Sequence, residues 1–162
     1  MTKTITFIRH AKSSWEYQVS DKNRPLKERG ISDAILVAKA LNQLGGTIDF
    51  AWSSPANRAL HTAMIVLGGV GYDFKKFQVS NTLYDFSGED VLGFIRSLHN
   101  GLDHVLLFGH NHAFTSLVNT LGDTYISNVP TAGLVRIVFK TDDWSTINKG
   151  TTLKTIFPKE LK

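Results

Sequence analysis

Basic side chains follow three apolar segments of this chain, and their types suit the binding of an anion. The first segment ends in Arg9 and His10, and a second ends shortly before Arg58. A third ends in Gly109 and His110. Guanidinium groups bind phosphate through paired N–H donors, and a helix N-terminus adds unpaired backbone amides. If these side chains meet, we therefore expect a phosphate site.

A histidine among arginines can also act as a nucleophile. Neighbouring cations depress the pKa of an imidazole and keep the ring neutral near pH 7. A neutral imidazole nitrogen is a competent nucleophile toward phosphorus, and phosphoryl transfer otherwise needs in-line positioning and neutralised oxygen atoms. Arginines provide that neutralisation without a metal ion. The residues therefore fit metal-independent phosphoryl transfer through a phosphohistidine intermediate.

The sequence offers little for a metal ion or another cofactor. His110 and His112 are separated by one residue, so their side chains diverge on a strand or a helix, and no carboxylate completes the set nearby. The chain has no cysteine, which excludes a cysteine zinc site, an iron–sulfur cluster, a disulfide and a thiol nucleophile. We expect neither a metal nor a cofactor.

Strands and helices are predicted to alternate along most of the chain. Apolar residues recur at helical spacing between Leu26 and Leu44, and Gly45-Gly46 ends that segment. Ser53-Ser54-Pro55 is expected to cap the next helix, with the proline just inside it. His99 and His104 flank a turn and are expected to be solvated. Strands are expected over 4–8, 48–52, 77–83, 104–108, 133–140 and 152–157, and helices over 26–44, 55–67, 88–98 and 112–121.

This alternation predicts an α/β fold, a three-layer sandwich in which helices cover both faces of a mainly parallel sheet. Ligands of such sheets bind beyond the carboxyl ends of the strands. The basic residues named above all lie at that edge, so the predicted fold brings them together. Residues 9–25 form a long polar loop, of a kind that is often functional. With 162 residues and no repeat or linker, the chain is expected to be a single domain over residues 1–162.

The net charge of 18 − 14 = +4 is concentrated at the two ends of the chain. Residues 1–30 carry 7 basic and 3 acidic residues, residues 31–148 carry 7 and 10, and residues 149–162 carry 4 and 1. A basic first segment indicates an anionic partner, although a solvated basic surface is the simpler explanation of charge alone. Basic and aromatic residues do not alternate as in a single-strand binding groove, so nucleic acid is not an expected partner.

No apolar run is long enough to cross a membrane. The apolar run before Arg9 is too short for the hydrophobic region of a secretory leader. We therefore expect a cytoplasmic protein without a membrane partner.

Four motifs, in order, resemble those of the histidine phosphatase superfamily, the phosphoglycerate mutase-like proteins. The agreement in order and separation covers residues 4–118. Alanine stands at position 11 where the family has glycine, which removes no chemical group. The matching stretches are Arg9-His10-Ala11, Arg24-Pro25-Leu26 with Gly30, Ser53-Ser54-Pro55 with Arg58-Ala59 and Thr62-Ala63, and Gly109-His110-Asn111.

The resemblance implies the superfamily's α/β sandwich and a set of roles. By it, His10 is the nucleophile, while Arg9, Arg58 and His110 bind the phosphoryl group. Arg24 is expected to reach that group from the long loop. The short length, the compact region between Thr82 and Val91, and the text RHAKSSW resemble the SixA-type phosphohistidine phosphatases.

Whether the enzyme also cleaves phosphate monoesters is expected to depend on Asp85. Many members of the superfamily place an acid two residues after a leucine beyond the third strand, and Leu83 puts Asp85 at that offset. SixA-type members often lack such an acid. A protonated imidazole leaves phosphorus more easily than an alkoxide does, so a P–N substrate needs less help from an enzymic acid. A catalytic Asp85 would allow phosphate monoesters to be cleaved as well.

Together these features predict a metal-independent hydrolase that removes phosphate from phosphohistidine in a protein. The expected partner is a phosphorylated protein or a small phosphorylated compound, and a small open pocket favours a monomer. One alternative is a small-molecule phosphomonoesterase or mutase of the same superfamily, with Asp85 as general acid. The other is a non-enzymatic binder of phosphate or nucleic acid.

Overall fold

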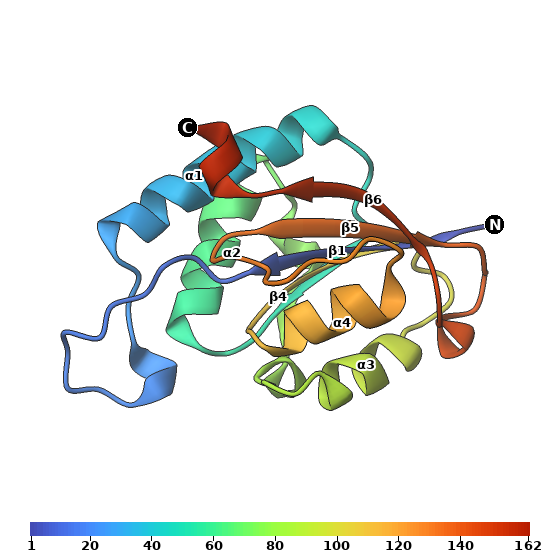
Figure 1. Cartoon of the computed structure of the whole chain (residues 1–162), viewed down its shortest axis with the longest axis horizontal. Helices are drawn as coiled ribbons and strands as arrows, with labels where there is room; N and C mark the ends of the chain where they lie inside the picture. Colours follow the sequence, from blue (N-terminus) through green and yellow to red (C-terminus); the bar gives the residue numbers. More distant parts are fainter.

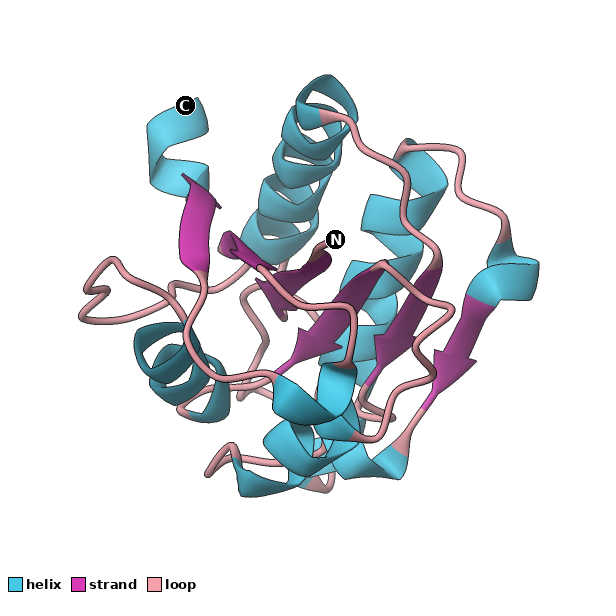
Figure 2. Ribbon diagram, turned by 90° about the vertical axis from the view of Figure 1, so that its right-hand side faces the viewer, coloured by secondary structure: helices cyan, strands magenta, loops and turns pink.

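The computed structural model describes residues 1–162 as a six-stranded sheet between two layers of helices (Figures 1 and 2). The strands are β1 (Lys3–Arg9), β2 (Phe50–Ser53), β3 (Phe77–Val79), β4 (His104–Gly109), β5 (Leu134–Phe139) and β6 (Thr151–Ile156). The helices are α1 (Glu28–Leu44), α2 (Asn57–Gly69), α3 (Glu89–Arg96) and α4 (Ala113–Leu121). Short 3-10 helices are η1 (Asp21–Asn23), η2 (Phe74–Lys76), η3 (Asn81–Leu83), η4 (Trp144–Thr146) and η5 (Pro158–Leu161).

The strand order is β3-β2-β4-β1-β5-β6, and the first four strands of that order are parallel. Strand β5 runs antiparallel to both of its neighbours, β1 and β6. The predicted α/β sandwich with a mainly parallel sheet is therefore confirmed. In the sheet Arg9 pairs with Gly109, and Ser53 pairs with Phe108. The ends of β1, β2 and β4 thus meet at one edge, to which β1 points on the left of Figure 1.

Each face of the sheet has its own apolar core, because successive side chains of a strand point to opposite faces. In β4, Val105 and Leu107 pack with residues of α3 and α4. Leu106 and Phe108 pack on the other side with residues of α1 and α2. All six residues of β4 are buried, which explains its continuous apolar run. These two cores hold the central strands rigidly behind the edge where the basic residues lie.

Three local predictions were wrong. Strand β3 stops at Val79, because the hydroxyl of Ser80 accepts a hydrogen bond from the amide of Thr82 and starts η3. Helix α2 begins at Asn57, and its capping residue is Ala56 rather than a residue of Ser53-Ser54-Pro55. His104 is 8% exposed, not solvated, and its ring lies between Thr6 and Thr47.

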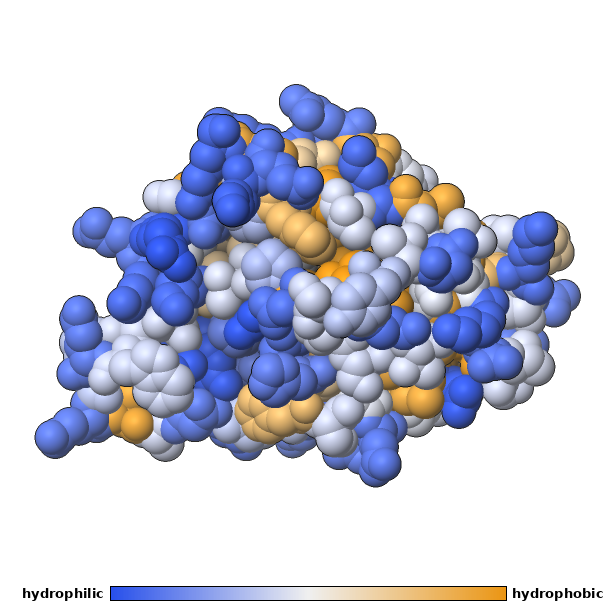
Figure 3. Space-filling model, in the orientation of Figure 1, coloured by the Kyte–Doolittle hydropathy of each residue, from blue (hydrophilic) through white to orange (hydrophobic).

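The long loop after β1 is tied to the start of α1. Ser13 and Leu26 form an isolated β-bridge, and the amide of Lys27 donates to the carbonyl of Lys12 at 2.9 Å. A Cβ atom on Gly30 would lie 2.3 Å from that same carbonyl oxygen, so only glycine permits this approach. The loop projects on the left of Figure 1, and hydrophilic residues cover most of that end in Figure 3. No helix is both long and apolar enough to cross a membrane.

Candidate active site

His10 is the first residue after β1 and is held at the sheet edge by its backbone. Its amide donates to the carbonyl of Gly109 at 3.0 Å, and its carbonyl accepts from the amide of Ala132 at 3.0 Å. The residue is 7% exposed and lines a cavity of about 250 Å³ at the carboxyl ends of the strands. Backbone contacts on both sides therefore fix the position of the imidazole before any ligand arrives.

The contacts of the His10 ring decide which of its nitrogens is free. Nδ1 lies 2.8 Å from the carbonyl oxygen of Ala11. A carbonyl oxygen only accepts hydrogen bonds, so Nδ1 carries the proton and Nε2 keeps its lone pair. Burial, opposed by the contact with Ala11 and assisted by the charges of His110, Arg58 and Arg9, lowers the pKa of His10 to about 3. The ring is thus neutral at pH 7, with Nε2 free for attack.

Three arginines line the cavity beside His10. Arg9 is the last residue of β1, and its Nη1 donates to the carbonyl of Val129 at 2.9 Å. Arg58 lies in the first turn of α2 and is 2% exposed. Arg24 enters from the long loop, where its Nη2 donates to Ser13 at 2.7 Å. Its guanidinium carbon stacks 3.4 Å from the centre of the Trp15 ring.

His110 directly follows β4, and its ring centre lies 5.3 Å from that of His10. Its Nε2 lies 2.7 Å from the hydroxyl of Ser54, while its Nδ1 is buried without a partner. Burial, followed by the charge of Arg58, lowers the pKa of His110 to about 3. A hydroxyl that donates to Nε2 leaves the proton on Nδ1, which makes that nitrogen a hydrogen-bond donor. Ser54 is thus a positioning residue that its motif alone did not reveal.

Unsatisfied donors gather at this one place. Seven buried side-chain polar atoms of the whole chain have no hydrogen-bond partner, and five of them belong to these residues. Buried polar groups are almost always paired, so a cluster of orphaned donors indicates a missing acceptor. A tetrahedral oxyanion supplies several acceptor oxygens at once. The five atoms are Arg9 Nε, Arg24 Nε, Arg24 Nη1, Arg58 Nε and His110 Nδ1.

Thr62 connects the His10 loop to α2. Its hydroxyl donates to the carbonyl of Arg58 at 2.7 Å and accepts from the amide of Ala11 at 2.9 Å. The residue is fully buried. One side chain therefore sets the distance between the backbone next to His10 and the backbone of Arg58, which accounts for the threonine of the third motif.

Asp21 is a residue of this site that no sequence motif indicates. Its Oδ2 and its carbonyl oxygen accept from the two terminal nitrogens of Arg58, at 2.9 and 2.7 Å. Oδ2 also accepts from the hydroxyl of Tyr84. Oδ1 lies 3.5 Å from Nε of Arg24 without a hydrogen bond. The signal that could have found it is its place three residues before Arg24, in the segment that enters the site.

Burial alone would raise the pKa of Asp21, but the hydrogen bonds from Tyr84 and Arg58 outweigh it and hold the pKa below its usual value. Asp21 is therefore an anion at neutral pH. It is also the single acidic residue that lines the cavity.

Asp85 is not among the residues that line this cavity. Its Oδ1 accepts from the amide and hydroxyl of Ser87, and its Oδ2 accepts from the amides of Gly88 and Val91. Burial acts to raise the pKa of Asp85, but these hydrogen bonds lower it overall. A carboxylate held by the backbone amides at the start of α3 has no proton to give near neutral pH.

The segment before β5 closes the cavity, although it carries no motif. Because α4 returns the chain to the amino edge, residues 122–133 must come back to the carboxyl edge before β5 begins. There Val129 accepts from Arg9, and Ala132 donates to His10. Ala132 has a φ of 60°, which is in the left-handed region and rare for alanine. Only the tertiary structure shows that this segment belongs to the site.

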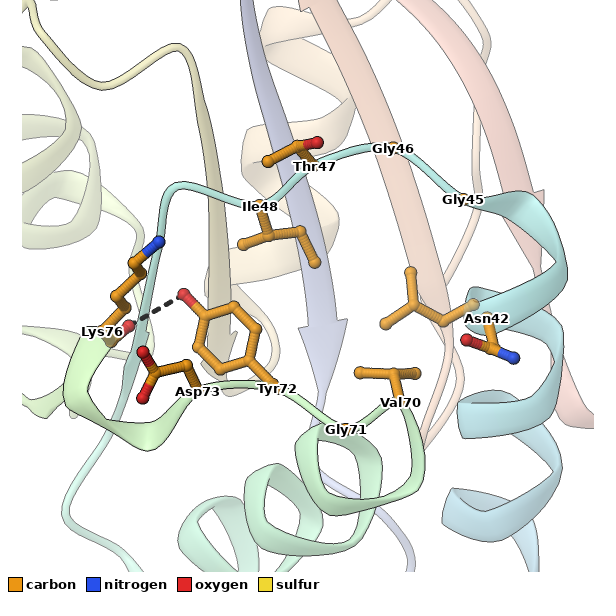
Figure 4. Close-up of a pocket in the computed structure, with 11 residues that line it drawn as sticks. Asn42, Gly45, Gly46, Thr47, Ile48, Val70, Gly71, Tyr72, Asp73 and Lys76 are labelled. Carbon is orange, nitrogen blue, oxygen red and sulfur yellow. Dashed lines mark hydrogen bonds between the residues drawn. The ribbon is translucent and has the colours of Figure 1, made fainter.

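A second cavity, of about 290 Å³, lies at the opposite edge of the sheet, between the ends of α1 and α2 and the strands that follow them (Figure 4). Gly45 and Gly46 border it, and the hydroxyl of Tyr72 donates to the carbonyl of Lys76 at 2.9 Å. Lys76 is its single basic residue. Nowhere in the chain do three or more His, Cys, Asp or Glu side chains cluster to hold a metal ion.

Comparisons with known proteins agree with this geometry. The family model of the histidine phosphatase superfamily (branch 1) matches residues 5–93. A 2,3-bisphosphoglycerate-dependent phosphoglycerate mutase of Bartonella tribocorum is 34% identical over 96 residues, which are 57% of this chain and 47% of that protein. The chain thus spans about half the length of this curated relative.

Solved structures resemble the chain over nearly its whole length. The protein histidine phosphatase SixA, complexed with tungstate, superposes with a TM-score of 0.79 at 24% identity, covering 98% of this chain and 99% of that one. A phosphoglycerate mutase from Bacillus anthracis superposes with a TM-score of 0.65 at 18% identity, covering 90% and 95%. At these identities the likeness concerns the fold.

Proposed function

This chain belongs to the histidine phosphatase superfamily (branch 1), and from that premise we propose that it is a phosphatase that hydrolyses phosphohistidine in a protein. The observation that carries the proposal is the set of five orphaned donors around a neutral His10. The proposed reaction needs no metal ion, because guanidinium and imidazole N–H groups neutralise the phosphoryl oxygens.

Binding would place the phosphoryl group between the arginines and the two histidines. Nε of Arg9 and Nε of Arg58 would each donate to a phosphoryl oxygen, together with Nδ1 of His110. Arg24 would add its free donors from the long loop. These donors are fixed beforehand by contacts with Val129, Asp21, Ser54 and Ser13, so little reorganisation accompanies the reaction.

In the first chemical step the lone pair on Nε2 of His10 attacks phosphorus. The P–N bond of the substrate breaks, and its electron pair returns to the leaving nitrogen of an imidazole that is protonated on its other nitrogen. The substrate histidine thus leaves neutral, while His10 becomes a phosphoimidazolium. One phosphoimidazolium replaces another, so the step needs no proton from the enzyme. The engagement of Asp85 with backbone amides is consistent with that chemistry.

In the second step water attacks the phosphorus atom. The bond between phosphorus and Nε2 of His10 breaks, and the electron pair restores the neutral imidazole with its proton on Nδ1. Both protons of the water leave with the phosphate as dihydrogen phosphate. The carbonyl of Ala11, 2.8 Å from Nδ1, stabilises the imidazolium of the intermediate and keeps the ring in one orientation.

The test is phosphate release from a phosphohistidine-bearing protein and from p-nitrophenyl phosphate, measured side by side with a chelator present. We expect turnover of the first substrate that exceeds turnover of the second. His10→Ala should lower turnover by at least about a thousandfold, as loss of a nucleophile does in other enzymes. His61→Ala, an exposed histidine on α2, serves as the matched control. Undiminished activity in His10→Ala would refute the proposal, and dominant monoester turnover would favour a general phosphomonoesterase.

A further inference from the structure

The carboxylate of Asp21 stands where a phosphatase of anionic substrates would not be expected to keep one. It contacts Arg58, a proposed phosphate ligand, at 2.9 Å. A phosphoryl group bound by Arg58 therefore lies close to a second negative charge, which opposes its binding. Either the carboxylate is only a counter-ion for the arginines, or it has a favourable partner in the rest of the substrate.

The two carboxylate oxygens of Asp21 differ in their contacts. Oδ2 is held by Arg58 and by the hydroxyl of Tyr84. Oδ1 accepts no hydrogen bond from the protein, and the side chain is 43% exposed. The group is therefore anchored through one oxygen while the other remains able to accept a hydrogen bond from a ligand at the rim of the cavity.

Other charges around Asp21 also determine what this oxygen can bind. Arg58 faces it from α2, Arg24 from the same loop, and Tyr84 from the segment after η3. Lys22 lies over the ring of Tyr84, 4.8 Å from its centre, and Lys12 lines the cavity. This surplus of cations keeps Asp21 ionised. Its carboxylate can therefore accept a hydrogen bond from an N–H or O–H group of a ligand, but it cannot donate a proton near pH 7.

We propose that Asp21 selects substrates whose phosphorylated group is a cation, by accepting a hydrogen bond from the N–H of the substrate's phosphoimidazolium ring through Oδ1. The inference rests on the proposed function and deepens it. A phosphohistidine ring leaves easily only when its second nitrogen is protonated. An anion beside that nitrogen stabilises its proton. When the leaving group carries no such proton, the carboxylate of Asp21 only repels the anionic substrate. Asp21 is thus a specificity-determining residue.

The test compares kcat/KM for a phosphohistidine peptide and for p-nitrophenyl phosphate in the wild-type protein and in Asp21→Asn. The variant keeps the shape and removes the charge. We expect kcat/KM for the peptide to fall about tenfold, the loss typical of one charge-assisted hydrogen bond, while kcat/KM for the monoester rises. The loss on the peptide should be larger at pH 8 than at pH 6, because fewer free substrate rings are protonated at pH 8.

Asp73→Asn is the matched control, since Asp73 is an exposed aspartate that begins another 3-10 helix, η2, far from these arginines. Thermal unfolding of both variants shows whether each is folded. A counter-ion role alone would change both substrates in the same direction, and an unchanged ratio of the two kcat/KM values in an active enzyme would overturn the inference. If the wild-type protein released no phosphate in a His10-dependent manner, the proposed function would fail, and this inference with it.

Discussion

His10 donates the hydrogen on Nδ1 to the backbone carbonyl of Ala11, its own neighbour in the chain, over 2.8 Å. The contact is local, yet it depends on the long-range hydrogen bonds that hold the backbone of His10 against Gly109 and Ala132. It leaves Nε2 as the unprotonated nitrogen of a residue that lines the same cavity as the arginines.

The first prediction is that the phosphoryl group is carried on Nε2 of His10 and not on Nδ1. Rapid mixing with a phosphohistidine peptide and quenching in alkali preserves the P–N bond, and 31P and 15N NMR of the denatured protein identify the substituted nitrogen. We expect the Nε2 isomer, because Nδ1 is occupied by its contact with Ala11. Finding the label on Nδ1, or on another residue, would contradict the mechanism.

The second prediction concerns protonation of the free protein. Burial lowers the pKa of His10 from 6.5 to about 3, so the ring should remain neutral from pH 8 down to pH 5. In 15N NMR spectra, the Nε2 signal that disappears in His10→Ala should show no protonation over that range. A midpoint near 6.5 would show that the ring is solvated and would remove the basis for a permanently available nucleophile.

The same shift predicts how stability depends on pH. The pKa of His10 is lowered in the folded protein, so below 6.5 the unfolded chain binds a proton that the folded protein does not. The contribution of the neutral His10 ring to the free energy of unfolding is complete above pH 6.5 and is lost as the pH falls toward 3. The free energy of unfolding in urea should therefore decrease between pH 7 and pH 4, and less steeply in His10→Gln. Equal slopes for both proteins would argue against the depressed pKa.

The third prediction assigns Asp85 to stability. Asp85→Ala removes the acceptor of the amides of Gly88 and Val91, which should lower the free energy of unfolding by about 1 kcal/mol, the usual cost of a lost helix cap. Urea unfolding measures the loss. Activity on both substrates should change less than threefold in the folded variant, with Asp85→Asn as the milder control. A drop of about a hundredfold for the monoester alone would restore Asp85 as its general acid.

The fourth prediction separates two glycines in helices. A Cβ on Gly30 would meet the carbonyl oxygen of Lys12 at 2.3 Å, whereas a Cβ on Gly93 has no atom within 4 Å. Gly30→Ala should therefore destabilise the protein by about 1–3 kcal/mol and displace the loop after His10, with loss of activity. Gly93→Ala should stabilise α3 by about 0.5–1 kcal/mol. Urea unfolding of the pair checks both signs, and a stabilised Gly30→Ala would contradict the close approach of α1 to the loop.

Much of the fold could be predicted because each central element buries a regular pattern. The continuous apolar run of β4 and the helical spacing in α1 are local features that burial on both sides of the sheet requires. The errors lie where a side chain bonds to nearby backbone. The hydroxyl of Ser80 accepts from the amide of Thr82 and ends β3 early. The hydroxyl of Ser54 accepts from the amide of Ala56 ahead of α2, and Ala56 stands at the capping position without a side-chain hydrogen bond. Competition between such short contacts and the sheet has no periodic pattern, so it could not be predicted from the pattern alone.

The sequence by itself determined that Arg9, His10, Arg58 and His110 lie at one sheet edge, because strands that alternate with helices run parallel and end at the same edge. Which nitrogen of His10 is free was decided only by tertiary structure, since hydrogen bonds to Ala11, Gly109 and Ala132 orient the ring.

The two aspartates show the same division. Asp85 has the sequence offset of an acid but is satisfied by backbone amides, whereas Asp21 has no such motif and meets Arg58 across 37 residues. The spacing of residues in the sequence predicts the helix, strand or loop to which a residue belongs. Whether its charge faces a ligand depends on which partners the rest of the chain brings within hydrogen-bond distance.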